Sequence, residues 1–193
     1  MVIRGFIEEE KLEEIVYKKI RELGITKSDY PIDPYQLAKE EGIILQEMQI
    51  DDVNIRGMLV HGPNATGILI NSNRCYVSKR FIAMHELCHH WFHPHRTKTV
   101  CFENYKTNKK GAEWQANNAA AIALMPADIM KEIYQYCNGD INYICKELKV
   151  SEDSVKYRIE KLGLIVPKTY EYQNYNIDNR FIALENTWLY GGI

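Results

Sequence analysis

The sequence predicts an α+β fold that is mostly helical, with a small three-stranded antiparallel sheet and a helix-turn-helix-like helical segment near the C-terminus. Apolar residues recur at helical spacing over residues 8–23 and in several later segments. Two apolar runs, 55–61 and 65–71, flank Gly62-Pro63-Asn64, whose residue types are typical of a hairpin turn. Together these patterns indicate helices packed on a small sheet.

The N-terminal part of the chain supplies packing elements in this prediction. The helix over residues 8–23 carries one apolar stripe and ends at a glycine. Asp33 is a favourable N-cap and Pro34 a favourable first helical residue, which predicts a short helix that ends at Gly42. The apolar residues 43–45 that follow are expected to form the third strand.

The second half of the chain is predicted to be helical, with one long loop. A helix is expected to begin with Ser78 as its N-cap and to stop at Pro94. Residues 94–112 show no clear period and hold five bases against one acid, so we expect a loop that rims the functional site. Four further helices are expected, over residues 113–125, 126–137, 140–148 and 152–162.

A length of 193 residues suggests one domain with a small appendage. We assign residues 1–137 to the main domain, residues 138–167 to the helix-turn-helix-like segment packed on it, and residues 168–193 to a C-terminal arm without strong periodicity. Residues 140–168 hold six bases and five acids, a balance of +1, and present no basic face. We therefore expect bundle packing, and no specific DNA binding by the chain alone.

Composition and charge exclude several classes of protein. A net charge of −2 argues against a strongly basic nucleic-acid binder. No run approaches the roughly 18 apolar residues of a membrane span, and the acidic residues soon after Met1 do not match a signal peptide. Five scattered cysteines without a C-x-x-C pair indicate free thiols in a reducing cytoplasm.

The stretch with the clearest chemical meaning is His85-Glu86-Leu87-Cys88-His89, which reads H-E-x-x-H inside a predicted helix. Residues four apart lie about 40° apart around a helix, so both imidazoles can reach one metal ion. Glu86 lies on the neighbouring edge, where it can act as a base on water. Catalytic Zn²⁺ prefers a tetrahedron with one position open for water, so a third protein ligand must come from elsewhere in the chain.

Two residues are candidates for the third ligand. Glu113 opens the Ala-rich helix that follows the long loop, and its carboxylate suits zinc. His93 stands four residues after His89 on the metal helix. Between His85 and His93 a helix turns about 80°, net of whole turns, and rises about 12 Å, which is too far for one ion. Glu113 is therefore preferred, and the other histidines are interpreted as surface or packing residues: His61, His90 and His95.

These motifs occur in the same order in a known family. Residues 80–89, Arg-Phe-Ile-Ala-Met-His-Glu-Leu-Cys-His, are followed by Glu113-Trp114-Gln115-Ala116-Asn117 and by Ala123-Leu124-Met125-Pro126. This series resembles the ImmA/IrrE family of metallopeptidases, and the similarity extends from Asp33 to about Gly163. One departure is Cys88, at a position where the family usually has a small residue such as glycine.

The resemblance implies a zincin-like zinc metallopeptidase domain in residues 1–137. Its implied metal ligands are His85, His89 and Glu113, with Glu86 as the catalytic base. Members of the family are bacterial, are often encoded by phages or mobile elements, and are implicated in cleaving helix-turn-helix repressors to derepress genes. We therefore expect a cytoplasmic, Zn²⁺-dependent endopeptidase that cuts a partner protein.

Further residues are expected around this site. Asn117, one turn after Glu113, is expected to accept a hydrogen bond from a ligand histidine, most directly His85; alternatively it is an ordinary polar residue near a helix start. The strand 65–71, just before the metal helix, is expected to be an edge that pairs with an extended substrate, or else an ordinary hairpin strand. The donor that stabilises the oxyanion stays open among four residues: His93, Tyr105, Tyr143 and Arg158.

Two other classes of function stay open at this point. In the first, the chain is a DNA-binding regulator that uses residues 140–164 and holds a structural zinc ion, which would need a fourth protein ligand. In the second, the chain is a regulatory module that binds a repressor without cutting it. The intact Glu86 favours catalysis over this second alternative.

Overall fold

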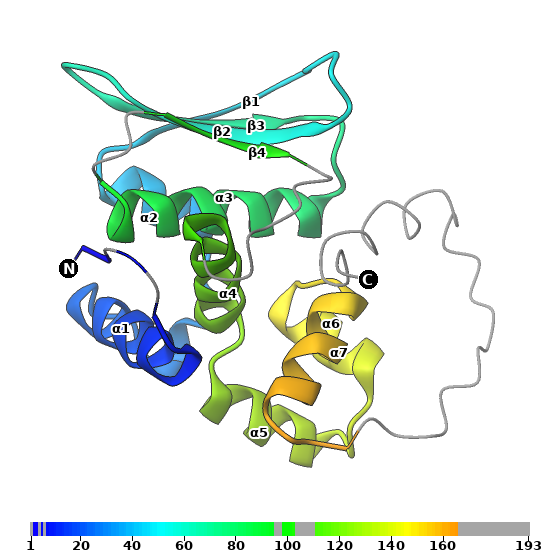
Figure 1. Ribbon diagram of the computed structural model, residues 1–193. Helices are drawn as coiled ribbons and strands as arrows, with labels where there is room; N and C mark the ends of the chain where they lie inside the picture. Colours follow the sequence, from blue (N-terminus) through cyan, green and yellow to red (C-terminus); the bar gives the residue numbers. More distant parts are fainter. Residues whose placement is uncertain (1, 4, 6, 95–97, 103–110, 166–193) are drawn as a thin grey trace.

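The computed structural model describes residues 2–3, 5, 7–94, 98–102 and 111–165 of the chain, and shows an α+β fold (Figure 1). This confirms the predicted class. The elements of these residues are α1 (Glu9–Glu22), the 3-10 helix η1 (Lys27–Asp29), α2 (Pro34–Glu40), β1 (Ile44–Met48), β2 (Ile55–His61), β3 (Thr66–Asn71), α3 (Tyr76–Phe92), β4 (Lys98–Phe102), α4 (Ala112–Leu124), α5 (Ala127–Tyr136), α6 (Ile141–Leu148) and α7 (Glu152–Lys161).

The four strands form one mixed sheet in the order β1-β3-β2-β4. β2 and β3 pair antiparallel as the predicted hairpin, and β1 pairs with β3 in parallel. β4 pairs antiparallel with the other side of β2. The prediction of a three-stranded antiparallel sheet is therefore wrong in the number of strands and in the direction of β1.

Long-range pairing explains both differences. Residues 98–102 lie in the stretch predicted as a loop. These five residues mix polar and apolar side chains without a clear period and are too few to predict a strand by themselves, and they form one because they pair with the edge of β2. β3 lies between β1 and β2 and runs antiparallel to β2. Because β1 also runs opposite to β2, it pairs with β3 in parallel. β3 is consequently an inner strand, which contradicts its predicted role as a substrate-pairing edge. The outer strands of the described sheet are β1 and β4.

Helix α3 is the centre of the core. It runs along one face of the sheet beside α2, and α4 crosses it on the side away from the strands (Figure 1). Successive residues of a strand point to opposite faces, and the buried Leu59, Ile68 and Ile70 supply the inner face of β2 and β3. Because α3 has neighbours on both sides, nearly all of its side chains from Ile82 to Phe92 are buried.

The predicted capping residue fits the structure at α2 but not at α3. Asp33 caps α2 as predicted, because its side chain accepts a hydrogen bond from the backbone N–H of Tyr35, and Ser151 caps α7 by accepting one from the backbone N–H of Ser154. α3 is different, because it begins at Tyr76 and contains the predicted cap Ser78 within its first turns. The Ser78 hydroxyl instead accepts a hydrogen bond of 2.8 Å from the buried guanidinium of Arg56 on β2.

Helices α6 and α7 share the core with the rest of the chain. The buried Arg158 of α7 donates to the carbonyl of Met125 at 2.9 Å and pairs with Glu13 of α1 at 2.5 Å. Arg80 of α3, also buried, donates to the carbonyl of Lys149 in the α6–α7 turn at 3.1 Å. Two buried arginines thus fix the helix-turn-helix-like segment: Arg80 binds the turn between α6 and α7, and Arg158 joins α7 to the residues around α4 and α1.

Parts of the predicted organisation lie outside the described residues, namely the C-terminal arm, 168–193, and residues 95–97 and 103–110 of the predicted loop. In the described part of the chain, no helix is long and apolar enough to cross a membrane.

Gly57 is expected to be intolerant of substitution, because β2 approaches α3 closely there. A Cβ at Gly57 would lie 2.4 Å from Cγ2 of Ile82 and 3.1 Å from the carbonyl oxygen of Leu69. Gly57→Ala should lower the free energy of unfolding by about 1–3 kcal/mol. Gly67→Ala is the matched control, since its Cβ would meet the carbonyl oxygen of Ile44 at an ordinary 3.7 Å. Urea unfolding of both variants measures the difference, and equal losses of stability would contradict the close approach.

Candidate metal centre

Two helices bring the three predicted ligands together. α3 carries His85 and His89 one turn apart, and α4 places Glu113, in its first turn, against both imidazoles. The two Nε2 atoms lie 3.1 Å apart. Oε2 of Glu113 lies 3.4 Å from Nε2 of His85 and 3.2 Å from Nε2 of His89. Both imidazoles are fully buried, and the carboxylate is largely so.

The triangle formed by these three atoms fits a tetrahedral metal ion. Ligands about 2.0–2.1 Å from zinc at the corners of a tetrahedron lie about 3.3–3.4 Å from one another. The three observed separations, 3.1, 3.2 and 3.4 Å, are close to that edge length. The donor types also fit, since two histidines and one glutamate form a known ligand set for catalytic zinc.

A second group of possible ligands shares His85. It adds Glu86 and Cys101, a buried residue of β4, to the same imidazole. Burial raises the pKa of the Cys101 thiol, which disfavours the thiolate that binds metal. The first group, whose three ligand-atom separations fit a tetrahedron, is the better metal site, and it leaves Glu86 outside the ligand set.

Glu86 is held as a fully buried carboxylate beside the triangle. Its Oε2 accepts a hydrogen bond of 2.8 Å from the hydroxyl of Thr99 on β4. Its Oε1 is buried and accepts no hydrogen bond from the described residues. Burial raises the pKa of Glu86 to about 7, against a smaller opposing effect of His85. A carboxylate with this pKa can both take and return a proton near neutral pH.

The protonation of the three candidate ligands is coupled. Burial lowers the pKa of His89 to about 4, so its imidazole is neutral, the form that binds metal. Burial opposes ionisation of Glu113, but hydrogen bonds with His85 and His89 outweigh it and hold its pKa well below the usual range. Burial also opposes the charged form of His85, but contacts with Cys101 and Glu113 raise its pKa, so a metal ion competes with a proton there.

Asn117 does not make its predicted hydrogen bond. Its Oδ1 atom is buried on α4 and has no hydrogen-bond partner among the described residues. A role beside His85 therefore stays a prediction. The next residue, Asn118, is engaged differently, because its Oδ1 accepts a hydrogen bond of 2.8 Å from the hydroxyl of Tyr157 on α7.

The predicted oxyanion donors have diverse positions. Arg158 is occupied by its contacts with Met125 and Glu13. Tyr143 lies on α6 beside the ring of Tyr136, partly exposed. Tyr105 lies outside the described residues. His93 is buried and contacts His89 and a residue of α4, so it belongs to the surroundings of the metal centre.

The remaining histidines agree with a packing role. The rings of His61 and His90 lie 5.2 Å apart, and Nε2 of His90 faces Glu41 at 3.8 Å. His95 lies outside the described residues.

Sequence reasoning missed two residues that contact the site, Thr99 and Gln115. Thr99 lies in a stretch without periodicity, so nothing local marked it as a partner of Glu86. Gln115 follows Glu113 by two residues inside the family motif, which was the one available signal. Its contact with His93, at 2.7 Å, depends on how α4 packs against α3.

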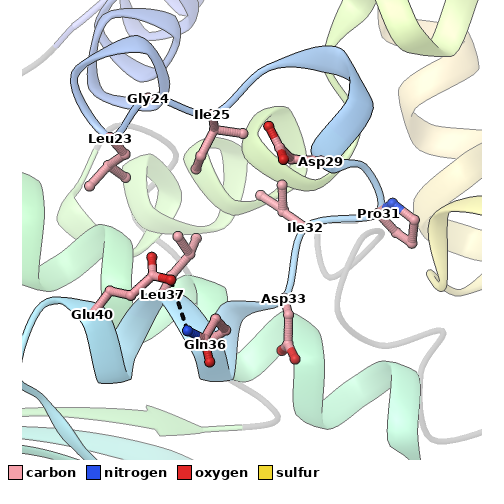
Figure 2. A pocket seen from close by; sticks show the side chains of 10 residues that line it. All are labelled: Leu23, Gly24, Ile25, Asp29, Pro31, Ile32, Asp33, Gln36, Leu37 and Glu40. Atoms are coloured by element: carbon pink, nitrogen blue, oxygen red, sulfur yellow. Dashed lines mark hydrogen bonds between the residues drawn. The ribbon is translucent and has the colours of Figure 1, made fainter.

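A pocket of about 360 Å³ lies between the end of α1, η1 and α2 (Figure 2). Its walls combine the apolar Leu23, Ile25 and Leu37 with Asp29 and Glu40. None of its lining residues belongs to either group of possible metal ligands. The pocket is therefore a separate feature from the metal centre.

Comparison with known proteins identifies the family. A family model described as peptidase M78, IrrE N-terminal-like domain, matches residues 38–160, which include β1 to β4, α3, α4 and both ligand groups. The chain belongs to this family. The resemblance read from the motifs is thereby confirmed, and with it membership of a metallopeptidase family. No curated protein matches the sequence.

One similar solved structure is described as a Mycobacterium tuberculosis transcriptional regulator. It superposes with a TM-score of 0.56 at 14% sequence identity, over 80% of this chain and 48% of that chain. This similarity shows a shared fold. The present chain spans about half of the length of that protein.

The two ligand groups can be separated by zinc affinity. Glu113→Ala should weaken zinc binding by more than the roughly 10- to 100-fold that loss of a residue supporting a ligand costs. Cys101→Ser should change it by no more than a few-fold, because the thiol lies outside the favoured group. Competition with a chromogenic chelator measures both affinities. The reverse order of effects would place the ion at His85, Glu86 and Cys101.

Proposed function

We propose that the chain is a zinc-dependent endopeptidase that hydrolyses a peptide bond in a partner protein. The observation that carries this proposal is the metal-fitting triangle of His85, His89 and Glu113 with the buried Glu86 beside it. His85, His89 and Glu113 would hold Zn²⁺, which would supply Lewis acidity to the reacting carbonyl group and water. Glu86 then takes the proton of the water and passes it to the leaving amine.

The residues around Glu86 support this role. Thr99 occupies one carboxylate oxygen, which leaves Oε1 as the oxygen that exchanges the proton. Gly57 lies close to this carboxylate on β2: a Cβ there would meet Oε1 at an ordinary 3.7 Å but would clash with Cγ2 of Ile82 at 2.4 Å.

Strand β4 is the element that we assign to substrate binding. It is an outer strand of the described sheet, and it carries both Thr99, which bonds Glu86, and Cys101, which lies beside His85. An extended peptide that paired with β4 would run past the metal centre and gain main-chain hydrogen bonds. This assignment replaces the expectation that β3 would be the pairing edge.

The proposed substrate is a helix-turn-helix repressor, whose cleavage would derepress genes in the cytoplasm. Membership of the peptidase M78 family and the resemblance to ImmA/IrrE proteins support this choice. The similar solved structure is described as a transcriptional regulator, which is consistent with the proposed role of this chain in regulating gene expression.

A role as a DNA-binding regulator is less well supported. All three basic residues of α7 already face acids: Lys156 lies 2.6 Å from Glu152, Lys161 lies 2.6 Å from Glu9, and Arg158 lies 2.5 Å from Glu13. DNA would have to compete with each of these pairs. Because Arg158 is buried, Lys156 and Lys161 are the basic residues of α7 that are partly exposed, and each lies beside an acid.

Specific DNA binding is accordingly expected to be absent. Fluorescence anisotropy with duplexes from the promoter region of the gene should give only weak, salt-sensitive binding. A specific complex with a Kd near ~10⁻⁸ M, typical of sequence-specific proteins, would contradict the prediction and favour the regulator.

Glu86→Gln should abolish proteolysis while zinc binding and the fold persist, because an amide cannot take the proton from water. The assay incubates zinc-loaded protein with the helix-turn-helix repressor encoded beside the gene, and mass spectrometry identifies the fragments. Glu147→Gln, at an exposed position of α6, is the control and should cut at the rate of the unmodified protein. Cleavage by Glu86→Gln at that same rate would refute the proposed mechanism.

Thr99→Val should lower kcat, because it removes the hydroxyl that orients Glu86. Loss of a hydrogen bond to a charged group costs about 1.5–3 kcal/mol, which corresponds to a decrease of roughly 10- to 100-fold. Thr99→Ser keeps the hydroxyl and should retain most of the activity. Steady-state kinetics on a peptide that spans the cleaved bond measures both variants, and equal rates would remove Thr99 from the mechanism.

A further inference from the structure

Three residues outside the proposed ligand set form a hydrogen-bonded chain behind His89. Nδ1 of His89 lies 3.2 Å from Nδ1 of His93, the residue that follows α3. Nε2 of His93 lies 2.7 Å from Oε1 of Gln115 on α4. Nε2 of Gln115 donates to the carbonyl oxygen of Gly5 at 2.7 Å. The His93 and Gln115 side chains are buried, so water does not compete for these contacts.

The donor and acceptor of each hydrogen bond in this series follow from the carbonyl oxygen of Gly5, at which the series ends. A backbone carbonyl oxygen only accepts, so the amide nitrogen of Gln115 must face Gly5. The amide oxygen of Gln115 therefore faces His93, and Nε2 of His93 must carry the proton that it accepts. In a neutral imidazole the other nitrogen is then an acceptor, so Nδ1 of His93 accepts and Nδ1 of His89 donates.

This order of donors decides which tautomer His89 adopts. With its proton on Nδ1, the lone pair of His89 lies on Nε2. That atom is the one that stands 3.1 Å from Nε2 of His85 and 3.2 Å from Oε2 of Glu113. A metal-binding histidine is commonly oriented in this way by an acceptor behind its ring, which is usually a carboxylate, a carbonyl or water.

We propose that His93 and Gln115 are positioning residues that hold His89 in the tautomer and ring orientation required for metal binding. The proposal rests on the proposed function only in taking His85, His89 and Glu113 as the metal ligands. It gives a role to His93, which is too far along the helix to be a ligand itself. It also explains a buried glutamine in the first turn of α4, two residues after Glu113.

The N-terminal segment ends the series of hydrogen bonds, because Gly5 fixes the orientation of the Gln115 amide. Gly5 supplies the carbonyl, and the backbone N–H of Ile3 donates to the carbonyl of Phe92, at the end of α3, at 2.8 Å. The segment is thereby tied to both helices that carry the proposed ligands. The positioning of His89 thus depends on three parts of the chain that are far apart in sequence.

The first test is the tautomer of His89 in the full-length protein prepared without metal. Nitrogen–proton correlation spectra of the imidazoles show which ring nitrogen carries the proton, independently of any peptidase activity. We expect the proton of His89 on Nδ1 and that of His93 on Nε2. A proton on Nε2 of His89 would overturn the proposal.

The second test is zinc affinity, measured by competition with a chelator. His93→Phe keeps a buried aromatic ring but removes the acceptor, and should weaken zinc binding by about 10- to 100-fold. His90→Phe is the control on the same helix, since His90 faces His61 and Glu41, and should leave the affinity unchanged. Equal affinities of the His93→Phe variant and the unmodified protein would overturn the proposal.

Gln115 supplies a rescue experiment that separates positioning from packing. Gln115→Leu removes the acceptor of the His93 proton and should weaken zinc binding, whereas Gln115→Glu keeps an acceptor oxygen and, as the neutral acid, a donor to Gly5, and should therefore retain more affinity than Gln115→Leu. Equal losses in both variants would overturn the assignment of Gln115. If the variants at His93 and Gln115 change zinc affinity as expected but the unmodified protein cuts no repressor, the proposed function is refuted and the positioning role remains supported.

Discussion

The structure depends on the burial of a charged and polar cluster inside its central helix. His85, Glu86 and His89 point out of α3 into the core, where each polar atom left without a partner costs about 1–3 kcal/mol. Thr99 from β4 and Glu113 from α4 supply the partners from the two sides of the helix. The sheet and α4 therefore supply partners for several polar groups of α3 as well as covering its apolar residues, and among the described residues Oε1 of Glu86 is left without one.

The same principle ties the C-terminal helices to the rest of the fold. Arg80 and Arg158 are buried, and their donors end on backbone carbonyls and on Glu13. Removing one partner of a buried ion pair commonly costs about 3–5 kcal/mol, because the other charge is left without compensation. Helices α6 and α7 are thus fixed by interactions that also keep Arg158 of α7 occupied. In the described part of the chain, the helix-turn-helix-like segment packs on the core through these buried arginines.

The errors of the sequence prediction share one physical cause. β4 was assigned to a loop, and β1 was expected to pair antiparallel, because strand identity at these positions depends on a partner that is distant in the sequence. The start of α3 was placed at Ser78 because serine favours N-caps, but its hydroxyl is used by Arg56 across the core. In each case a tertiary contact overrode a local preference. The elements whose signals were local, such as α2 with Asp33 and Pro34 and the hairpin of β2 and β3, agree with the prediction.

The sequence by itself determined the features that follow from backbone geometry. A helix places residues four apart on one side, so the spacing of His85 and His89 was sufficient to predict converging imidazoles with Glu86 beside them. Only the tertiary structure decided what surrounds them: the contact of Glu113 with both imidazoles, the bond from Thr99 to Glu86, and the chain from His89 through His93 to Gln115. These contacts join α3 to β4 and α4, which follow it in sequence. Local periodicity carries no information about the distance between elements, because that distance is set by how whole faces pack.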